Sequence, residues 1–212
     1  GGIVVQTNPL YTPRELANLY RDAGAVAVVT VDLFLPNVLE AMSGAEIRLV
    51  VVADLKDFLP APLAWFYPLR RRRDLKRAGH WPLRAPRERW LRTFREVLGL
   101  SRGAAPGPRT VARDDVAVLQ YTGAPTGLPK GAMLTHGTLI ANALQCSAWV
   151  PEQPPEGGRM LLAIPMFHIY GLMAGLMVSI RLAATMLLVP DPRDLKHLLK
   201  VIDREHPTLF PA

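Results

Sequence analysis

Cysteine is almost absent from this sequence, because Cys146 is the only one among 212 residues. A single thiol excludes a disulfide within the chain and is typical of a reducing compartment, so we expect a cytoplasmic protein. Cys146 lies in a predicted helix without a nearby His, which favours a small core residue over a nucleophile. An initiator Met and a charged leader are also missing, and the chain stops at an apolar Phe210-Pro211-Ala212. We therefore expect no signal peptide and an internal fragment of a longer protein.

A membrane-spanning run is missing as well. The most apolar stretch, residues 161–189, contains Gly171 and Gly175 in a G-x-x-x-G pattern. His168 and Arg181 divide it into pieces of 12 and 8 residues, whereas a spanning helix needs about 18. We predict a buried helix and strand here, with the glycines permitting close helix packing.

Acidic residues are scarce in one basic segment. From Arg70 to Arg95 there are ten Arg and one Lys against two acids, a net charge of +9, and the rest of the chain carries −2. This segment belongs to residues 54–112, which we expect to form a basic, aromatic insert and a linker.

Three interpretations of the insert stay open. It is a solvated helical insert whose aromatics pack on the core, a membrane-surface patch at Arg70–Arg73, or a nucleic-acid surface. Trp favours membrane interfaces, and each Lys or Arg near anionic lipid gains about 1 kcal/mol. Because no recognised nucleic-acid module accompanies the charge, we expect no nucleic-acid partner. A peripheral position at the inner membrane face is a further expectation.

Apolar patterning predicts alternating strands and helices. Strands are expected at residues 2–7, 26–31, 47–53, 116–121, 160–164, 185–189 and 208–210, and helices at 12–23, 33–42, 135–149 and 191–205, with one more apolar helix after 165–172. The first helix has a strong start signal in Thr12, Pro13 and Glu15. This alternation predicts an α/β fold with a mostly parallel sheet and flanking helices.

One loop dominates the functional interpretation. The stretch from Tyr121 to His136 reads Y-T-G-A-P-T-G-L-P-K-G-A-M-L-T-H and follows an apolar strand. Unpaired N–H groups in a loop of this kind bind anions, with Lys130 as a mobile charge, and a helix is expected to open near Thr135. It is not an ordinary P-loop, because the order is Pro-Lys-Gly without a hydroxyl after the lysine.

The stretch resembles the phosphate loop of the adenylate-forming superfamily, which includes acyl-CoA synthetases, luciferases and peptide-synthetase adenylation domains. That loop has the form Y-T-S/G-G-T/S-T-G-x-P-K-G. Residues 2–16, P-M-F-H-I-Y-G-L from Pro165, and H-P-T-L-F-P from His206 are similar to segments of long-chain acyl-CoA synthetases. The L-P-A-P-L sequence before the arginines is similar to the insert of bacterial members. The resemblance covers nearly the whole chain.

The resemblance implies that residues 1–212 are part of the large N-terminal AMP-binding domain of a long-chain fatty acid–CoA ligase, without the C-terminal domain. Its substrates would be a long-chain fatty acid, ATP and CoA, and Mg²⁺ would be held by ligands outside this chain. A homodimer is a further expectation. The family's catalytic lysine lies outside this chain, so the chain alone is not expected to complete the reaction.

By matching positions, the resemblance also implies site residues. The ATP phosphates would contact Thr122, Gly123, Ala124, Pro125, Thr126, Gly127, Lys130 and Gly131. His168 would line the acyl site, and Tyr170 and Gly171 would border the fatty-acid tunnel.

Two loop positions depart from the family pattern. Ala124 stands where Gly is usual, and Pro125 stands where Thr or Ser is usual. Pro125 removes a hydroxyl and an N–H, and a hydrogen bond to a charged group contributes about 1.5–3 kcal/mol. Two alternatives therefore stay open beside the ligase: a non-catalytic acyl- or nucleotide-binding remnant, and an adenylating enzyme for another carboxylic acid.

Overall fold

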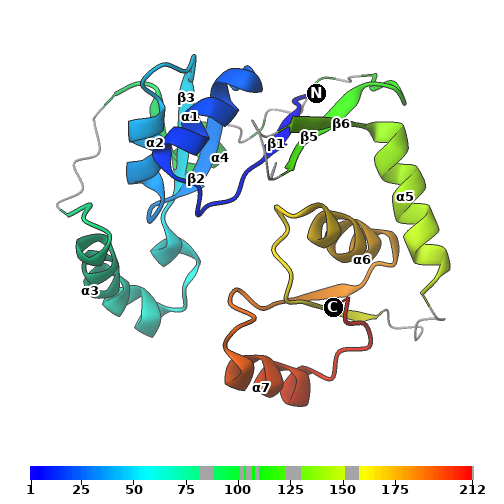
Figure 1. Ribbon diagram of the computed structural model, residues 1–212. Helices are drawn as coiled ribbons and strands as arrows, with labels where there is room; N and C mark the ends of the chain where they lie inside the picture. The colour runs from blue at the N-terminus through cyan, green and yellow to red at the C-terminus, as the bar shows by residue number, and fades with distance from the viewer. Residues whose placement is uncertain are drawn as a thin grey trace. The chain divides into compact units, whose positions relative to one another are not determined.

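The computed structural model describes residues 1–81, 88–100, 103, 107, 110–122, 130–150 and 158–211. The chain forms two compact units (Figure 1). We call Gly1–Asn8 with Arg109–Ala212 the loop unit, and Pro9–Pro108 the arginine unit. Most of the predicted insert therefore lies in the arginine unit.

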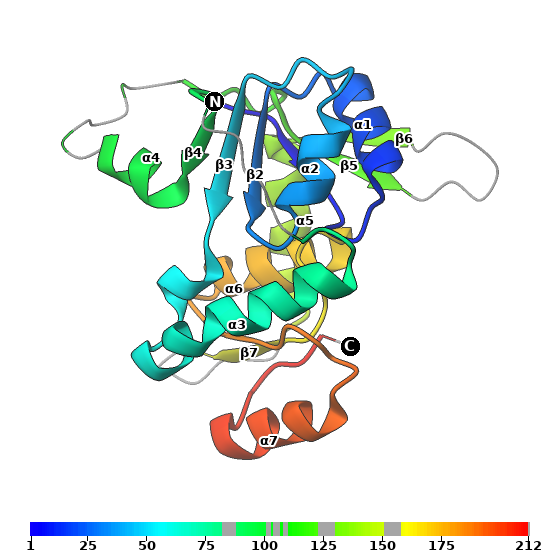
Figure 2. The ribbon, with the colours of Figure 1, turned by 90° about the vertical axis from the view of Figure 1, so that its left-hand side faces the viewer.

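The arginine unit is built on a three-stranded parallel sheet in the order β2-β3-β4. Its strands are β2 (Ala27–Val31), β3 (Leu49–Ala53) and β4 (Leu91–Thr93). Its helices are α1 (Pro13–Asp22), α2 (Leu35–Ala41), the 3-10 helix η1 (Leu55–Phe58), α3 (Ala61–Arg77) and α4 (Phe94–Leu100). Figure 2 shows α3 crossing beyond the carboxyl ends of β2 and β3.

Local sequence accounts for the first helix. Thr12 and Glu15 form a capping box, in which the Thr12 N–H donates to the Glu15 carboxylate at 2.8 Å and the Glu15 N–H donates to Thr12 Oγ1 at 3.3 Å. Pro13 occupies the first turn, where no backbone N–H is needed. These contacts confirm the predicted helix start.

The predicted insert contributes to the core of the arginine unit. Leu35 and Val38 of α2 pack on Val50 of β3, and Trp90 packs against the same cluster. Immediately after Trp90, the unexpected strand β4 pairs with β3. The helical and aromatic character of this segment was expected, but its contribution to the sheet was not.

The loop unit contains two small sheets. The first has the order β1-β5-β6, with β1 parallel and β6 antiparallel to β5, and the second pairs β7 with β8 in parallel. The strands are β1 (Val4–Gln6), β5 (Val116–Thr122), β6 (Lys130–Thr135), β7 (Arg159–Leu162) and β8 (Thr185–Leu188). The helices are α5 (His136–Ala148), the π-helix η2 (Gly171–Met177), α6 (Val178–Arg181) and α7 (Leu195–Glu205).

Two predictions for this unit need correction. Lys130–Thr135 is a strand, because it pairs with β5 along its length, whereas the sequence suggested a loop running to the helix. The strand expected at residues 208–210 is only an isolated bridge between Leu209 and Met160.

The core of the loop unit joins β5 to its helices. Ala117 and Val118 of β5 pack with Ala143 of α5 and with Leu172 and Met173 of η2. In the part of the chain that the structure describes, no helix is long and apolar enough to cross a membrane.

Candidate phosphate and acyl site

The predicted phosphate loop connects the two strands of a β-hairpin. Thr122 and Lys130 face each other in the β5–β6 ladder, and Thr122 Oγ1 donates to the Lys130 carbonyl at 3.5 Å. The loop between them holds five predicted phosphate contacts, Gly123, Ala124, Pro125, Thr126 and Gly127, which lie outside the described residues. The hairpin therefore places a hydroxyl and an ammonium-bearing residue at the two ends of this loop.

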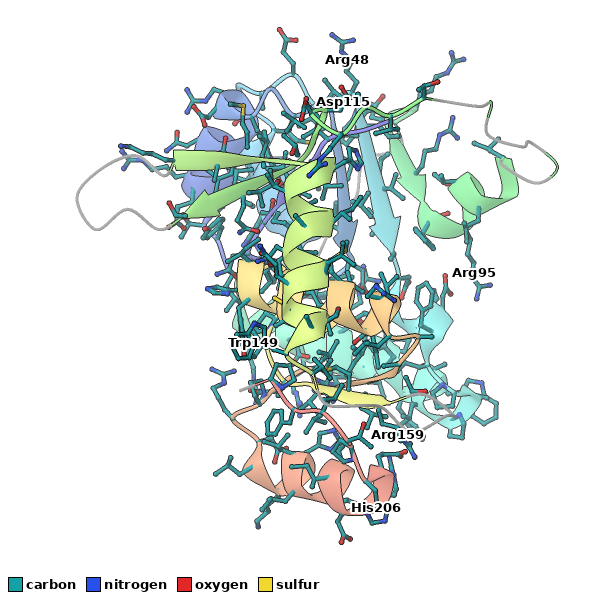
Figure 3. The ribbon with its side chains drawn as sticks, turned by 90° about the vertical axis from the view of Figure 1, so that its right-hand side faces the viewer. Arg48, Arg95, Asp115, Trp149, Arg159 and His206 are labelled. Carbon is teal, nitrogen blue, oxygen red and sulfur yellow. The ribbon has the colours of Figure 1, made fainter. Side chains whose placement is uncertain are left out.

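The start of α5 offers no open anion site. The N–H of His136 donates to the Asp115 carbonyl at 3.0 Å, and the N–H of Gly137 donates to the Arg113 carbonyl at 2.8 Å. The N–H of Thr138 donates to Thr135 Oγ1 at 3.2 Å. Figure 3 shows Asp115 close to the first turn of the helix. The helix start that was expected to adjoin the loop is separated from it by β6 and is closed by protein groups.

Gly131 has a packing role of its own. It lies opposite Tyr121 in the ladder, and a Cβ atom at Gly131 would come within 3.0 Å of Tyr121 Cζ. The Tyr121 ring is buried. Glycine at this position therefore lets the tyrosine ring lie across the hairpin directly beside the loop.

The predicted acyl residues lie on the turn that follows β7, which we call the acyl segment (residues 164–171). The N–H of His168 donates to the Pro165 carbonyl at 3.0 Å, and the N–H of Leu172 donates to the His168 carbonyl at 2.9 Å. The N–H of Tyr170 donates to His168 Nδ1 at 3.3 Å. Because Nδ1 accepts, a neutral His168 carries its proton on Nε2, which makes Nε2 a donor.

The acyl segment occupies a position where α/β folds bind ligands, at the carboxyl end of a parallel strand. The His168 and Tyr170 side chains are exposed, whereas Gly171 is buried. A Cβ at Gly171 would lie 2.3 Å from the Pro165 carbonyl oxygen, and one at Gly175 would lie 2.8 Å from Leu162 Cδ2. The close packing predicted from the glycine pair is therefore present, and Gly171 fixes the shape of the segment.

A side-chain hydrogen bond connects the phosphate-loop strand to the acyl segment. Gln120 of β5 donates from Nε2 to the Phe167 carbonyl at 3.2 Å. Sequence reasoning missed this residue. Its only signal was a lone polar side chain in the apolar run V-A-V-L-Q-Y.

A shallow hollow of about 560 Å³ lies elsewhere in the loop unit. It is lined by residues 111–113 and by one side of α5, and no predicted site residue contributes to it. Among the described residues, no group of three or more His, Cys, Asp or Glu side chains could hold a metal ion.

The arginine run in the other unit differs in exposure from one residue to the next. Arg71 Nε lies 2.9 Å from the Asp32 carboxylate, and the Arg71 side chain is only 29% exposed. The contact is an ion pair and not a hydrogen bond, because Arg71 Nε makes no hydrogen bond to any described residue. Arg71 therefore faces the protein, and the predicted patch Arg70–Arg73 is not uniform. Arg70, Arg72 and Arg73 are exposed.

The partner of Arg71 is a buried carboxylate at the end of β2. Asp32 is 1% exposed and also accepts a hydrogen bond from the Tyr67 hydroxyl at 3.0 Å. Burial, followed by the charge of Asp32, raises the pKa of Tyr67, so its hydroxyl stays protonated and donates. This network holds α3 at the carboxyl end of the sheet, where the ribbon in Figure 2 shows the helix.

The sequence of the chain is similar to proteins of one known enzyme family. The sequence model of a family described as "AMP-binding enzyme" matches residues 1–212. A long-chain-fatty-acid–CoA ligase of Bacillus subtilis (strain 168) is 38% identical over 218 residues, covering 100% of this chain and 37% of that protein. A long-chain-fatty-acid–CoA ligase of Haemophilus influenzae is 33% identical, covering 96% of this chain and 36% of that protein.

Solved structures share the fold. A long-chain-fatty-acid-CoA ligase from Archaeoglobus fulgidus superposes with a TM-score of 0.68 at 22% identity, covering 97% of this chain and 34% of that one. The anthranilate CoA ligase AuaEII, solved with anthranoyl-AMP, gives a TM-score of 0.71 at 22% identity, covering 98% and 34%. The chain thus spans little more than a third of the length of these relatives.

Proposed function

Because the chain belongs to the AMP-binding enzyme family, we propose that it is part of an ATP-dependent ligase that joins long-chain fatty acids to CoA. The observation that carries the proposal is identity of 38% over 100% of the chain and of 33% over 96% of it to two proteins named as long-chain-fatty-acid–CoA ligases. The hydrogen bond from β5 to the acyl segment supports it, because it joins the two predicted substrate regions within one unit.

The proposed reaction has two steps. A fatty-acid carboxylate oxygen attacks the α-phosphorus of ATP, the bond from that phosphorus to the bridging oxygen breaks, and pyrophosphate leaves. The CoA thiolate then attacks the acyl carbon, and AMP leaves with the bonding electrons. Mg²⁺, when bound, would neutralise phosphate charge, and we expect its ligands outside this chain.

The residues at the ends of the hairpin fit phosphate chemistry. The Thr122 hydroxyl is a neutral donor, and the Lys130 ammonium is a charged one, a combination suited to phosphate oxygens. With the loop residues between them, they would hold the β- and γ-phosphates. In the acyl segment, the His168 Nε2–H would face the acyl carboxylate region, with Tyr170 and Gly171 bordering the fatty-acid chain.

The test is pyrophosphate release by the complete protein with a panel of acids. We expect release with long-chain fatty acids, and a loss of about 10²-fold in Lys130→Met, as for other charge-stabilising donors. Lys196→Met, an exposed lysine on α7, is the matched control and should keep full activity. Release with aryl or amino acids instead would favour the alternative adenylating enzyme. No release with any acid would favour the non-catalytic remnant.

A second candidate function, binding to an anionic membrane surface, is favoured by the exposed face of α3. Its first half exposes Trp65, Phe66 and Leu69, which are 77%, 67% and 67% accessible. Its second half exposes basic side chains, namely Arg70, Arg72, Arg73, Lys76 and Arg77. We propose that the aromatic half enters the lipid interface while the basic half binds anionic headgroups. Such binding would place the protein at the inner membrane face.

Vesicle sedimentation tests this surface. We expect binding to vesicles containing phosphatidylglycerol, weaker binding in high salt, and little binding to neutral vesicles. Replacing Trp65 and Phe66 with Ser should weaken binding, whereas Trp149→Ser should not, although Trp149 is 90% exposed at the end of α5 (Figure 3). Equal loss in both variants, or salt-independent binding, would contradict the proposal.

Light scattering of the complete protein tests the expected homodimer.

A further inference from the structure

Gln120 is a polar side chain in a strand packed on both faces. It is 8% exposed, and its neighbours Ala117, Val118 and Tyr121 are also buried. An apolar residue would fit this setting at lower desolvation cost, because a buried amide must find hydrogen-bond partners. The position of those partners therefore indicates what the amide does.

Two carbonyls determine how the amide is oriented. Nε2 lies 3.2 Å from the Phe167 carbonyl oxygen and 3.5 Å from the Tyr121 carbonyl oxygen. Reversing the amide would point its oxygen at two acceptors, so Nε2 must occupy this place. Oε1 is buried and makes no hydrogen bond to any described residue. The amide is therefore held through its donor side, by the bond to the Phe167 carbonyl.

The bond to Phe167 crosses between the two predicted substrate regions. Alternate residues of a strand share a face, so Gln120 lies on the same face of β5 as Thr122, at the start of the phosphate loop. Phe167 directly precedes His168, whose N–H and carbonyl shape the acyl segment. A shift of the loop strand would therefore be transmitted to the acyl segment through this hydrogen bond, beside the apolar contacts of Ala117 and Val118 with the cluster that includes Ile169.

We infer that Gln120 is a positioning residue that sets the acyl segment in register with the phosphate loop. The inference rests on the proposed function, since it concerns the alignment of the carboxylate with the α-phosphorus. A misplacement of about 1 Å can lower a rate by about 10²-fold. Loss of the Nε2 donor should therefore affect fatty-acid use and turnover, while ATP binding through the loop is retained.

The kinetic test uses three variants of the complete protein. Gln120→Met removes both polar atoms, and Gln120→Glu keeps an acceptor but removes the donor. Gln145→Met, on the exposed side of α5, is the matched control. We expect both Gln120 variants to lower kcat about 10-fold and to raise the fatty-acid KM, with the ATP KM within about twofold of wild type. Unchanged kcat and fatty-acid KM, or an equal rise in both KM values, would overturn the inference.

A second measurement does not depend on activity. Amide hydrogen exchange of the full chain reports the His168 and Leu172 N–H groups, which are bonded to Pro165 and His168. We expect faster exchange of these two amides in Gln120→Met than in Gln145→Met, at an equal thermal midpoint. Equal exchange rates would overturn the inference even if wild type released no pyrophosphate. Faster exchange in a protein that releases no pyrophosphate would support the positioning role of Gln120 and would count against the proposed function alone.

Discussion

Differences in packing predict that Gly→Ala changes at Gly171 and Gly175 of η2 and at Gly99 of α4 will have three different effects on stability. A Cβ at Gly171 would lie 2.3 Å from the Pro165 carbonyl oxygen and 2.9 Å from its carbon. These are backbone atoms, so they cannot turn away, and the acyl segment must shift. At Gly175 the obstacle is Leu162 Cδ2 at 2.8 Å, the end of a flexible side chain, whereas at Gly99 of α4 nothing lies within 4 Å.

Magnitudes follow from two opposing terms. Replacing Gly by Ala inside a helix gains up to about 1 kcal/mol, and overpacking typically costs about 1–3 kcal/mol. We expect Gly171→Ala to lose about 2 kcal/mol, because its contact is the shortest and the least able to relax. Gly175→Ala should be close to neutral, and Gly99→Ala should gain about 0.5 kcal/mol or more.

Urea denaturation of the full chain, followed by circular dichroism, measures all three. The predicted order of stability is Gly99→Ala, then Gly175→Ala, then Gly171→Ala. If Gly171→Ala were as stable as Gly175→Ala, the reasoning that places the helix against the Pro165 backbone would be refuted.

Three further predictions concern other parts of the chain. Asp32→Ala should cost about 2–3 kcal/mol in urea unfolding, because it removes the acceptor of the buried Tyr67 hydroxyl and the nearer of the two carboxylates beside Arg71; the exposed Asp203→Ala should cost almost nothing. Burial raises the pKa of Tyr20 from 10.0 to about 12, so its contribution is complete below pH 10 and is lost as the pH rises towards 12. Between pH 10 and pH 12 the free energy of unfolding of Tyr20→Phe should therefore fall by about 2 kcal/mol less than that of wild type. Equal falls in the two proteins would contradict this. Replacing Ala124 by Gly together with Pro125 by Thr should raise acyl-adenylate formation about 10²-fold, because it restores a hydroxyl and a backbone N–H to the loop; no gain would count against an impaired loop.

The sequence predicted those elements whose signal is local. The α1 start follows from Thr12 and Glu15, and buried strands such as β3 follow from β-branched runs. By contrast, β4 has only three residues, too few for a clear pattern. Strand β6 begins with Lys, Gly and Ala, and these three residue types are poor strand formers. Both are strands because a neighbouring strand supplies their hydrogen bonds, which is a tertiary effect that the local sequence does not reveal.

The candidate site rests on sequence motifs, but its contacts could not be predicted from them. Four consecutive arginines look alike in sequence, and only the facing of α3 selects Arg71 for Asp32, which is distant in the chain. Gln120 and Phe167 are likewise separated by 47 residues. Motif matching proposed the hairpin ends and the acyl segment as site residues, whereas the hydrogen bond between Gln120 and Phe167 could be seen only in the fold.

Detection of the acyl-adenylate tests the central proposal most directly. The complete protein would be incubated with ATP, Mg²⁺ and palmitate, and the products identified by mass spectrometry before and after addition of CoA. We predict palmitoyl-AMP in the first sample and palmitoyl-CoA with AMP in the second. Absence of palmitoyl-AMP, together with adenylates formed from other acids or with no adenylate at all, would contradict a long-chain fatty acid–CoA ligase.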